Sequence, residues 1–283
     1  MSRDIKLDRN DFELLRKQIY RMCGLIIADG KEYLIQHRFK ALYNSRDCRS
    51  WRDFYQLLVS GDEQFKEEAV SAISTHETSF FRDNHPFVFI RNKVLPKLLE
   101  NRRFGSKIKI WCAASSTGQE PYSLAMLIHE WARIVPRAKV SPDDFSILAT
   151  DISGAVIDKA KDGYFTNHEK MRGLPAGYDK YFEKSGNGWM LQPAVKSLVT
   201  FKKFNLLDSF RPLGLFDFVL CRNVLIYFDD ATKINIVHRI HDLLPDKGYL
   251  MLGATETLVG HTDRFETEHE GVVILYRKKS IKK

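Results

Sequence analysis

The chain has 283 residues, of which 44% are hydrophobic and 28% are charged. This composition is typical of a folded globular protein and argues against global disorder, and the length favours two domains. The longest stretch without Asp, Glu, Lys or Arg is residues 185–195, which is too short for a membrane span of about 20 apolar residues. The first residues contain no apolar segment of a secretion signal. We therefore expect a cytoplasmic protein without membrane insertion.

The cysteines and the basic residues bear on possible ligands and partners. Cys23, Cys48, Cys112 and Cys221 form no C-x-x-C pair, which argues against a zinc site and against a disulfide framework. The net charge is +8, and residues 36–52 carry a concentrated share of it. We call this the basic cluster, and its members are Arg38, Lys40, Arg46, Arg49 and Arg52. Such a cluster is either a solvated helix face or a docking surface for an acidic partner.

Residues 1–75 are predicted to form an all-helical domain. A capping pattern at Asp8 opens a helix that ends at Gly24, and a second helix covers residues 31–43. Ser50 is the expected cap of a third helix, and residues 62–73 supply a fourth. Residues 76–106 are interpreted as a junction, with a linker helix that runs from Pro86 to about residue 103.

Residues 107–283 change to alternating strands and helices. The predicted strands are residues 108–112, 145–150, 216–221, 248–253 and 272–277, and the predicted helices are residues 120–135, 154–161 and 231–244. Near-continuous apolar strands that alternate with helices indicate a mostly parallel sheet covered on both faces. Residues 185–188 read as the turn of a β-hairpin, so we expect a small β-subdomain inserted at about residues 165–203.

In such a sheet, ligands bind beside the carboxyl ends of the strands. The loop at residues 112–121 is rich in small residues and contains Gly118, so it forms either a ligand-binding loop or only a tight turn. Asp151 ends the next strand, where it either accepts ribose hydroxyls or caps the following helix. Arg222 and Asn223 end a third strand, and they either meet a ligand or pair within the loop.

Four segments of the chain together resemble one known family. They are residues 78–83 (TSFFRD), 111–123 (WCAASSTGQEPYS), 149–152 (ATDI) and 221–228 (CRNVLIYF). In this order they are similar to the chemoreceptor glutamate methyltransferases, the CheR family, and the resemblance covers nearly the whole chain. It implies a Rossmann-like S-adenosylmethionine methyltransferase sheet with an all-helical N-terminal domain and an inserted β-subdomain. It also implies that the enzyme forms glutamate methyl esters on receptors during chemotaxis adaptation, with S-adenosylhomocysteine as product.

The resemblance also assigns roles to single residues. The expected cofactor contacts are His76, Thr78, Arg82, Ala113, Glu120, Asp151, Asn205, Leu206, Arg222 and Asn223. Glu120 would lie against the methionine end of the cofactor, Asp151 would hold the ribose, and Asn205 with Leu206 would flank the adenine. His76 departs from the family, whose members often carry Asn there.

Arg82 and Tyr227 are the expected catalytic residues, because Arg82 can steer the substrate carboxylate and Tyr227 can position it. The alternatives are a pairing of Arg82 with Asp83 or across the junction, and a core position for Tyr227. A glutamate side chain has a pKa of about 4.3, so the nucleophile is already ionised at neutral pH and no general base is required.

The expected partners are the cytoplasmic helices of chemoreceptors, near membrane-bound receptor arrays, and a receptor C-terminal tail peptide that adds to the hairpin edge. We expect a monomer that binds no nucleic acid and no metal. Two other functions stay open: a methyltransferase acting on RNA or another small substrate, and a non-catalytic regulator that binds S-adenosylmethionine. Nucleobase methyltransferases commonly carry a Pro-Pro-aromatic loop, where this chain has residues 223–227 (NVLIY).

Overall fold

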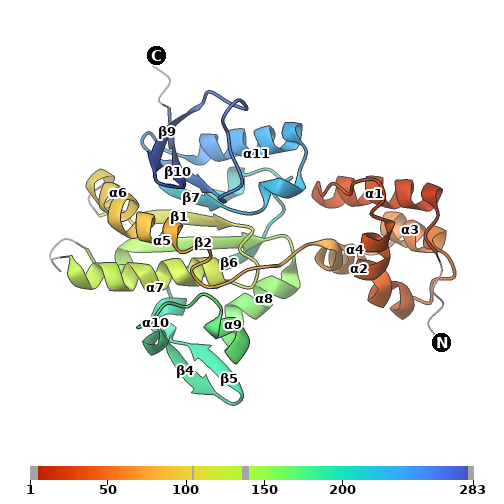
Figure 1. The fold of residues 1–283 in the computed structure, drawn as a ribbon, viewed down its shortest axis with the longest axis horizontal. Coiled ribbons are helices and arrows are strands. Elements are labelled where there is room, and N and C mark those ends of the chain that lie inside the picture. Colours follow the sequence, from red (N-terminus) through yellow and green to blue (C-terminus); the bar gives the residue numbers. More distant parts are fainter. Residues whose placement is uncertain (1–5, 104, 136–139, 280–283) are drawn as a thin grey trace.

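The computed structural model describes residues 6–103, 105–135 and 140–279. It contains a helical N-terminal domain and a larger domain built on a β-sheet, with a small second sheet that projects from the larger domain (Figure 1). Residues 1–5 of the predicted first domain lie outside these ranges. Within the described ranges, no helix has the length and the apolar character that a membrane crossing requires.

Four helices form the N-terminal domain: α1 (Arg9–Cys23), α2 (Glu32–Ser45), α3 (Trp51–Ser60) and α4 (Glu63–Ile73). The predicted caps are present, since the Asp8 carboxylate accepts a hydrogen bond from the backbone N–H of Asp11 at 2.8 Å, and Gly24 ends α1 with a φ of 74°. Apolar side chains at helical spacing, among them Phe12, Phe39 and Phe54, meet in one fully buried core. The predicted all-helical domain is confirmed.

The main sheet has seven strands and confirms the predicted α/β class. In spatial order they are β6 (Val199–Lys203), β2 (Phe145–Asp151), β1 (Ile108–Ala113), β7 (Phe218–Cys221), β8 (Tyr249–Leu252), β10 (Val273–Lys278) and β9 (Phe265–Glu270). The strands from β6 to β8 are parallel, whereas β10 and β9 pair antiparallel. Neither β6 nor β9, the two edge strands, was expected from the sequence.

Helices cover both faces of this sheet. Cys112 of β1 packs in one core with α7 (Gln119–Ile134), whereas its neighbour Trp111 packs in a second core with α11 (Asp230–Leu243). This alternation follows from the pleat of the strand, in which successive side chains point to opposite faces. From β1 the chain continues to β2 and β6 on one side of the sheet and then returns to β7 on the other side of β1. The switch point therefore lies between β1 and β7, beside the carboxyl ends of these strands.

The linker helix differs from the continuous helix that the sequence predicts. It consists of α5 (His85–Phe89), a π-helical segment (Ile90–Val94) and α6 (Leu95–Asn101). Pro96 has no N–H to donate to the carbonyl of Asn92, and its ring would crowd that carbonyl in a regular α-helix. The widened turn before Pro96 accommodates this constraint.

The second sheet holds three antiparallel strands in the order β3 (Tyr164–Thr166), β5 (Gly188–Leu191) and β4 (Phe182–Ser185). The predicted hairpin is confirmed, with Gly186 at a φ of 56°. Gly188 is needed for a different reason, because a Cβ there would lie 2.4 Å from the Tyr164 hydroxyl oxygen. The short helix α9 (Asn167–Met171) packs against this sheet, whereas α10 (Pro193–Lys196) packs against α7, and α8 (Gly154–Asp162) against β2 and β6 of the main sheet. The predicted end of the insertion near residue 203 is too late, because β6 belongs to the main sheet.

The junction is anchored to the inserted subdomain by Phe80. The buried Phe80 ring lies 4.9 Å from the Phe165 ring and 5.4 Å from the Phe182 ring, both in edge-to-face contact. Gly173 makes this approach possible, because it has a φ of 83° and a Cβ there would lie 2.1 Å from the backbone oxygen of Phe80. The backbones of the junction and the insertion therefore meet at a position where only glycine fits.

We predict that Gly173→Ala destabilises the protein by about 1–3 kcal/mol more than Gly177→Ala. Gly177 is the matched control, since it has a φ of 86° but nothing within 4 Å of an added Cβ. Both variants should lose about 1 kcal/mol for the left-handed backbone, and only Gly173→Ala should add the overlap. Denaturant unfolding measures the difference, and equal losses would contradict the close backbone approach.

Candidate active site

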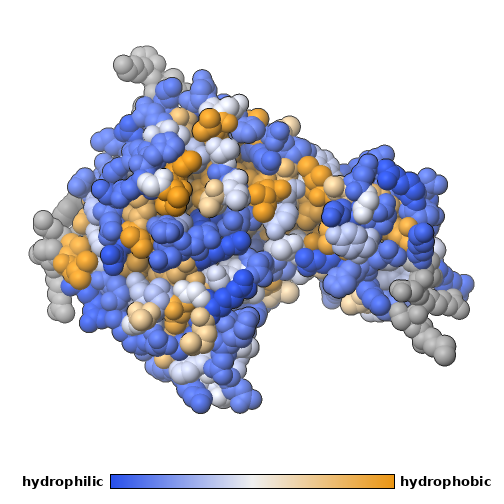
Figure 2. All heavy atoms as spheres, viewed as in Figure 1, coloured by the Kyte–Doolittle hydropathy of each residue, from blue (hydrophilic) through white to orange (hydrophobic). Residues whose placement is uncertain are grey.

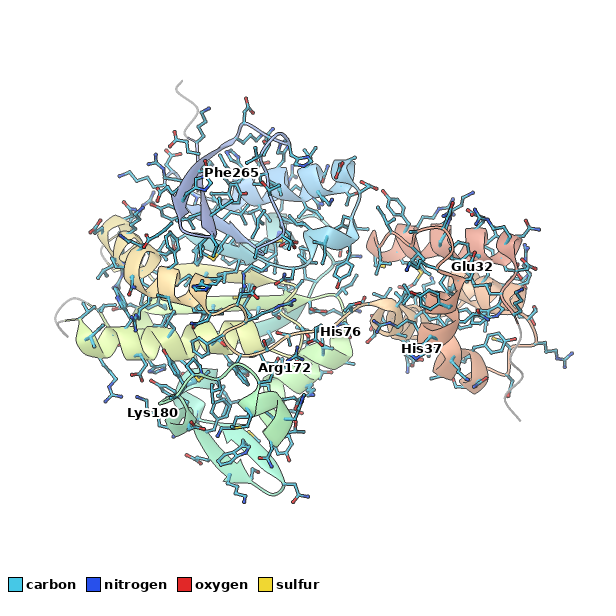
Figure 3. All side chains as sticks on the ribbon, in the orientation of Figure 1. Glu32, His37, His76, Arg172, Lys180 and Phe265 are labelled. Carbon is cyan, nitrogen blue, oxygen red and sulfur yellow. The ribbon has the colours of Figure 1, made fainter. Side chains whose placement is uncertain are left out.

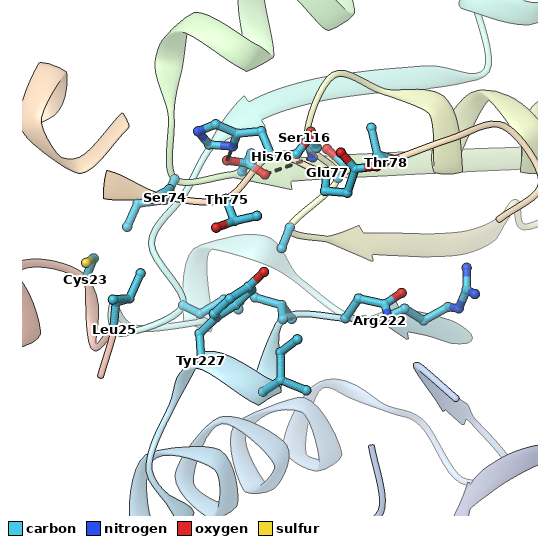
Figure 4. A pocket seen from close by; sticks show the side chains of 18 of the residues that line it. Cys23, Leu25, Ser74, Thr75, His76, Glu77, Thr78, Ser116, Arg222 and Tyr227 are labelled. Carbon is cyan, nitrogen blue, oxygen red and sulfur yellow. Dashed lines mark hydrogen bonds and ion pairs between the residues drawn. The ribbon is translucent and has the colours of Figure 1, made fainter. Parts of the chain in front are cut away.

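A cavity of about 290 Å³ lies where the carboxyl ends of β1, β2 and β7 meet the N-terminal domain. Its volume is close to the lower end of the roughly 300–1,000 Å³ typical of small-molecule sites. In Figure 4 the segment from Ser74 to Thr78 lies along one side, with Tyr227 and Arg222 along the opposite side. The predicted site residues that line the cavity are His76, Thr78, Arg82, Glu120, Asp151, Asn205, Leu206, Arg222, Asn223 and Tyr227. Ala113 is the exception, because it is fully buried within β1, and Ala114 lines the cavity instead.

The loop between β1 and α7 forms one wall of the cavity with a strained backbone. Ala114, Ser116 and Gly118 have φ values of 56°, 50° and 93°. Two of these are non-glycine residues in the left-handed region, a kind of strain that concentrates at ligand sites. A Cβ at Gly118 would lie 3.1 Å from the side chains of Ala160 and Tyr122, so glycine allows the loop to pack closely there.

Asp151 presents a buried carboxylate to the cavity from the end of β2. Its side chain accepts hydrogen bonds from the backbone N–H groups of Ser116 at 2.8 Å and Ser153 at 3.1 Å. Burial raises the pKa of Asp151, and these backbone donors counteract the rise. Ser153, rather than Asp151, is the N-cap of α8, so the alternative role of Asp151 as helix cap is wrong.

His76 lies in the region where the two domains meet (Figure 3). Its Nδ1 atom is 4.0 Å from a carboxylate oxygen of Asp151, and its Nε2 atom is 3.1 Å from the Ser71 carbonyl oxygen. The Ser116 hydroxyl donates to the carbonyl of His76 at 2.8 Å. These contacts hold the junction against the strained loop, so the two segments meet at Asp151.

Arg222 joins three segments of the chain beneath the cavity. Its side chain is only 1% exposed and donates to the carboxylates of Glu120 at 2.7 Å and Asp83 at 2.9 Å. It also donates to the carbonyl of Arg82 at 3.2 Å. Burial raises the pKa of Glu120, and the positive charge of Arg222 counteracts that rise. Arg222 thus links the end of β7 to α7 and to the junction.

The two predicted catalytic side chains, Arg82 and Tyr227, are not tied up in ion pairs within the described part of the chain. The Arg82 guanidinium donates to the Glu77 carbonyl at 3.1 Å, whereas Asp83 pairs with Arg222, so the predicted alternative of an Arg82–Asp83 pair is not what the structure contains. Tyr227 is partly exposed and lines the cavity, which excludes a core position. Both side chains are therefore positioned to meet a ligand.

The N-terminal domain completes the cavity. Asn205 donates its amide to the Met22 carbonyl at 2.9 Å, and Tyr20 donates to the carboxylate of Asp229 at 2.6 Å. Figure 2 shows a mostly hydrophilic surface on the helical domain and apolar patches where the two domains meet. Cys23 and Leu25 consequently enter the cavity wall. Neither residue was expected from the sequence, because no local pattern in α1 or in the residues after it indicates which side chains face the other domain.

The donor set of the cavity fits a nucleoside-containing cofactor. A buried carboxylate at the end of β2 suits ribose hydroxyls, and the small residues of the β1–α7 loop permit close contact with a ligand. In the described part of the chain, two buried polar atoms near the cavity lack a hydrogen-bond partner, the Ser115 hydroxyl oxygen and Arg222 Nε. Among the described residues, no group of three His, Cys, Asp or Glu side chains is arranged to hold a metal ion.

Comparisons with known proteins agree with this geometry. Residues 10–74 match the model of the CheR methyltransferase all-alpha domain, and residues 76–274 match that of the CheR methyltransferase SAM binding domain. A chemotaxis protein methyltransferase 1 of Pseudomonas aeruginosa is 39% identical over 95% of this chain and 98% of its own length. A chemotaxis protein methyltransferase 1 of Vibrio cholerae is 40% identical over 91% of this chain and 92% of its own. The chain therefore belongs to the CheR family of S-adenosylmethionine-dependent methyltransferases in chemotaxis.

Proposed function

We propose that this methyltransferase acts on the carboxylates of glutamate side chains in the cytoplasmic helices of chemoreceptors. The observation that carries the proposal is the shared cavity, in which a buried carboxylate suited to ribose and the guanidinium of Arg82 line the same space. The relatives named as chemotaxis protein methyltransferases support a substrate that belongs to chemotaxis. The cytoplasm, beside receptor arrays, is the location that this substrate implies.

Different elements that line the cavity would contact different parts of the cofactor. Asp151 would accept the ribose hydroxyls, and the loop from Ala114 to Ser116 would lie with Glu120 against the methionine end. The side-chain amide of Asn205 is already bonded to the Met22 carbonyl and to the backbone N–H of Leu207. The adenine would therefore contact the backbone of Asn205 and the neighbouring residue Leu206. His76 and Thr78 would close the cavity from the junction.

When bound, the cofactor supplies a methyl group on a positively charged sulfur. The protein then needs no general base, because a glutamate with a pKa of about 4.3 is ionised at neutral pH. Arg82 would attract and orient the incoming carboxylate, and the Tyr227 hydroxyl would fix its approach. Orientation of this kind can contribute roughly 7 kcal/mol or more to the rate, so we propose alignment as the main catalytic effect.

The substrate assignment is tested with a radiolabelled methyl group in the cofactor. We expect label to enter a purified receptor cytoplasmic fragment and to be released as methanol by mild base, since carboxylate methyl esters are base-labile. Replacement of the target glutamates by glutamine in the fragment is the control. Label in RNA but not in receptor would favour the RNA methyltransferase, and cofactor binding without transfer would favour the non-catalytic regulator.

We predict that Arg82→Ala lowers the rate at saturating substrates by about tenfold or more, and that Tyr227→Phe lowers it severalfold. Both residues orient the carboxylate, so the fold should be retained. Arg91→Ala is the matched control, because Arg91 is exposed and outside the cavity wall. Initial rates with receptor fragment measure the effect. If both variants keep the full rate, the substrate carboxylate does not bind beside Arg82 and Tyr227.

A receptor tail peptide would add to the small sheet. The order β3-β5-β4 leaves β4 at an edge, and its Glu183 and Lys184 side chains are exposed. An extended peptide can pair with such an edge through main-chain hydrogen bonds, which depend little on salt. Peptide titration at low and high salt tests this contact, and absence of any binding of a receptor tail peptide would rule it out.

The basic cluster would contact the acidic helices that carry the target glutamates. Arg38 donates to the Ser74 carbonyl at 3.3 Å and so lies beside the cavity wall. An α-helix rises about 1.5 Å per residue, so Arg46, the C-cap residue of α2, lies about 12 Å farther along the helix axis than Arg38. Arg46 forms an ion pair with Glu68 at 3.3 Å and Arg52 with Asp11 at 2.7 Å. In the described part of the chain, Arg49 has no ion pair.

We predict that Arg46→Glu with Arg49→Glu slows receptor methylation and flattens its dependence on salt, while S-adenosylhomocysteine affinity is unchanged. Exposed charges act over about 8 Å at physiological ionic strength, so added salt should weaken the native contact. Arg91→Glu with Lys93→Glu applies the same charge change outside the helical domain. If the methylation rate changes neither with the charge reversal nor with added salt, the basic cluster is only a solvated surface.

A further inference from the structure

Glu256 lies in the loop after β8, and its carboxylate collects four backbone hydrogen bonds. One oxygen accepts from the N–H groups of Asn223 and Gly253, each at 2.7 Å. The other accepts from Val224 at 3.0 Å and from Leu225 at 2.7 Å. The residue is 9% exposed. One buried carboxylate therefore satisfies three consecutive N–H groups at the start of a short 3-10 helix (Leu225–Tyr227), where the backbone offers no acceptor.

The loop that Glu256 holds is part of the cavity wall, whereas Glu256 itself is not. The segment from Arg222 to Tyr227 contributes side chains to the wall on both sides of the bonded backbone. Asn223 within it has a φ of 58°, in the left-handed region that few L-residues adopt. A conformation of this kind persists only where the surroundings enforce it, and the Glu256 carboxylate is the group bonded to that N–H.

The geometry is specific to a carboxylate of this length. Four N–H donors require two acceptor oxygens, and a glutamine amide has only one oxygen and would turn its own NH₂ toward two of the donors. The space is also closely fitted, since a Cβ at Gly253 would lie 2.6 Å from Glu256 Oε2. Loss of an acceptor from buried N–H groups costs more than loss of one exposed hydrogen bond.

We propose that Glu256 is a positioning residue of the active site. By fixing the backbone of residues 223–225 it places Asn223 toward the cofactor and Tyr227 toward the substrate carboxylate. The second half of this statement rests on the proposed function, and the first half rests only on the cofactor site. Glu256 does not touch the reacting groups, and it acts through the loop alone.

Glu256→Gln tests the proposal against a matched control, Asp217→Asn. Asp217 directly precedes β7, at the end of the strand opposite to Asn223. Its carboxylate accepts one backbone hydrogen bond, from the N–H of Lys109 at 2.8 Å. We expect Glu256→Gln to weaken S-adenosylhomocysteine binding by about tenfold or more in calorimetric titration. It should also lower kcat with receptor, whereas Asp217→Asn should change the unfolding midpoint without changing the affinity.

Glu256→Asp adds a readout that a purely structural role would not move. It keeps both acceptor oxygens and the charge, and withdraws them by one methylene, so it should recover part of the affinity lost in Glu256→Gln. Affinity unchanged in Glu256→Gln would overturn the proposal, as would equal affinity in Glu256→Gln and Glu256→Asp. If Glu256→Gln yields no folded protein, Glu256→Asp decides alone, and native affinity in it overturns the proposal. If the wild-type protein binds S-adenosylhomocysteine but does not methylate the receptor fragment, only the proposed function is contradicted.

Discussion

The buried guanidinium of Arg222 is the interaction on which the cavity depends. A buried charge is tolerated only when it is paired and hydrogen-bonded, and the partners of Arg222 come from α7 and from the junction, through Glu120 and Asp83. The end of β7, the start of α7 and the segment between the domains must therefore come together for the charge to be satisfied. Removal of either carboxylate would leave Arg222 insufficiently paired and loosen three walls of the cavity at once.

Two other buried carboxylates beside the cavity also bind groups of a different chain segment. Asp151 holds the N–H of Ser116 in the β1–α7 loop, and Glu256 holds the N–H groups of the loop after β7. These contacts fix irregular backbone beside the space where a cofactor would lie. A site of this kind suits the proposed reaction, which depends on alignment and would need no proton transfer by the protein.

Much of the fold could be predicted because its signals are local. The caps at Asp8 and Ser50 and the apolar strand of residues 218–221 indicate their structures from a few neighbouring residues. The edge strands β6 and β9 were missed for a physical reason, since they are only partly covered and carry charged residues. In β9, Glu268 pairs with Lys97 of α6, and that contact gives no local pattern in the sequence.

The site was predictable where strand ends supply it and unpredictable where distant segments meet. Asp151 ends one apolar strand and Arg222 follows another, so their place at the carboxyl ends of the strands could be inferred. Cys23 and Leu25 enter the wall only because the helical domain docks on the sheet domain. Glu256 stands in a loop of polar residues, and its bonds to residues 223–225 depend on the pairing of β7 with β8.

The most direct measurement is a crystal structure of the protein with S-adenosylhomocysteine. We expect the ligand in the cavity between the two domains, with both ribose hydroxyls on the carboxylate of Asp151. We also expect the sulfur end beside Glu120, facing Arg82 and Tyr227. A ligand bound outside this cavity, or one whose ribose lies away from Asp151, would show that the cavity is not the cofactor site.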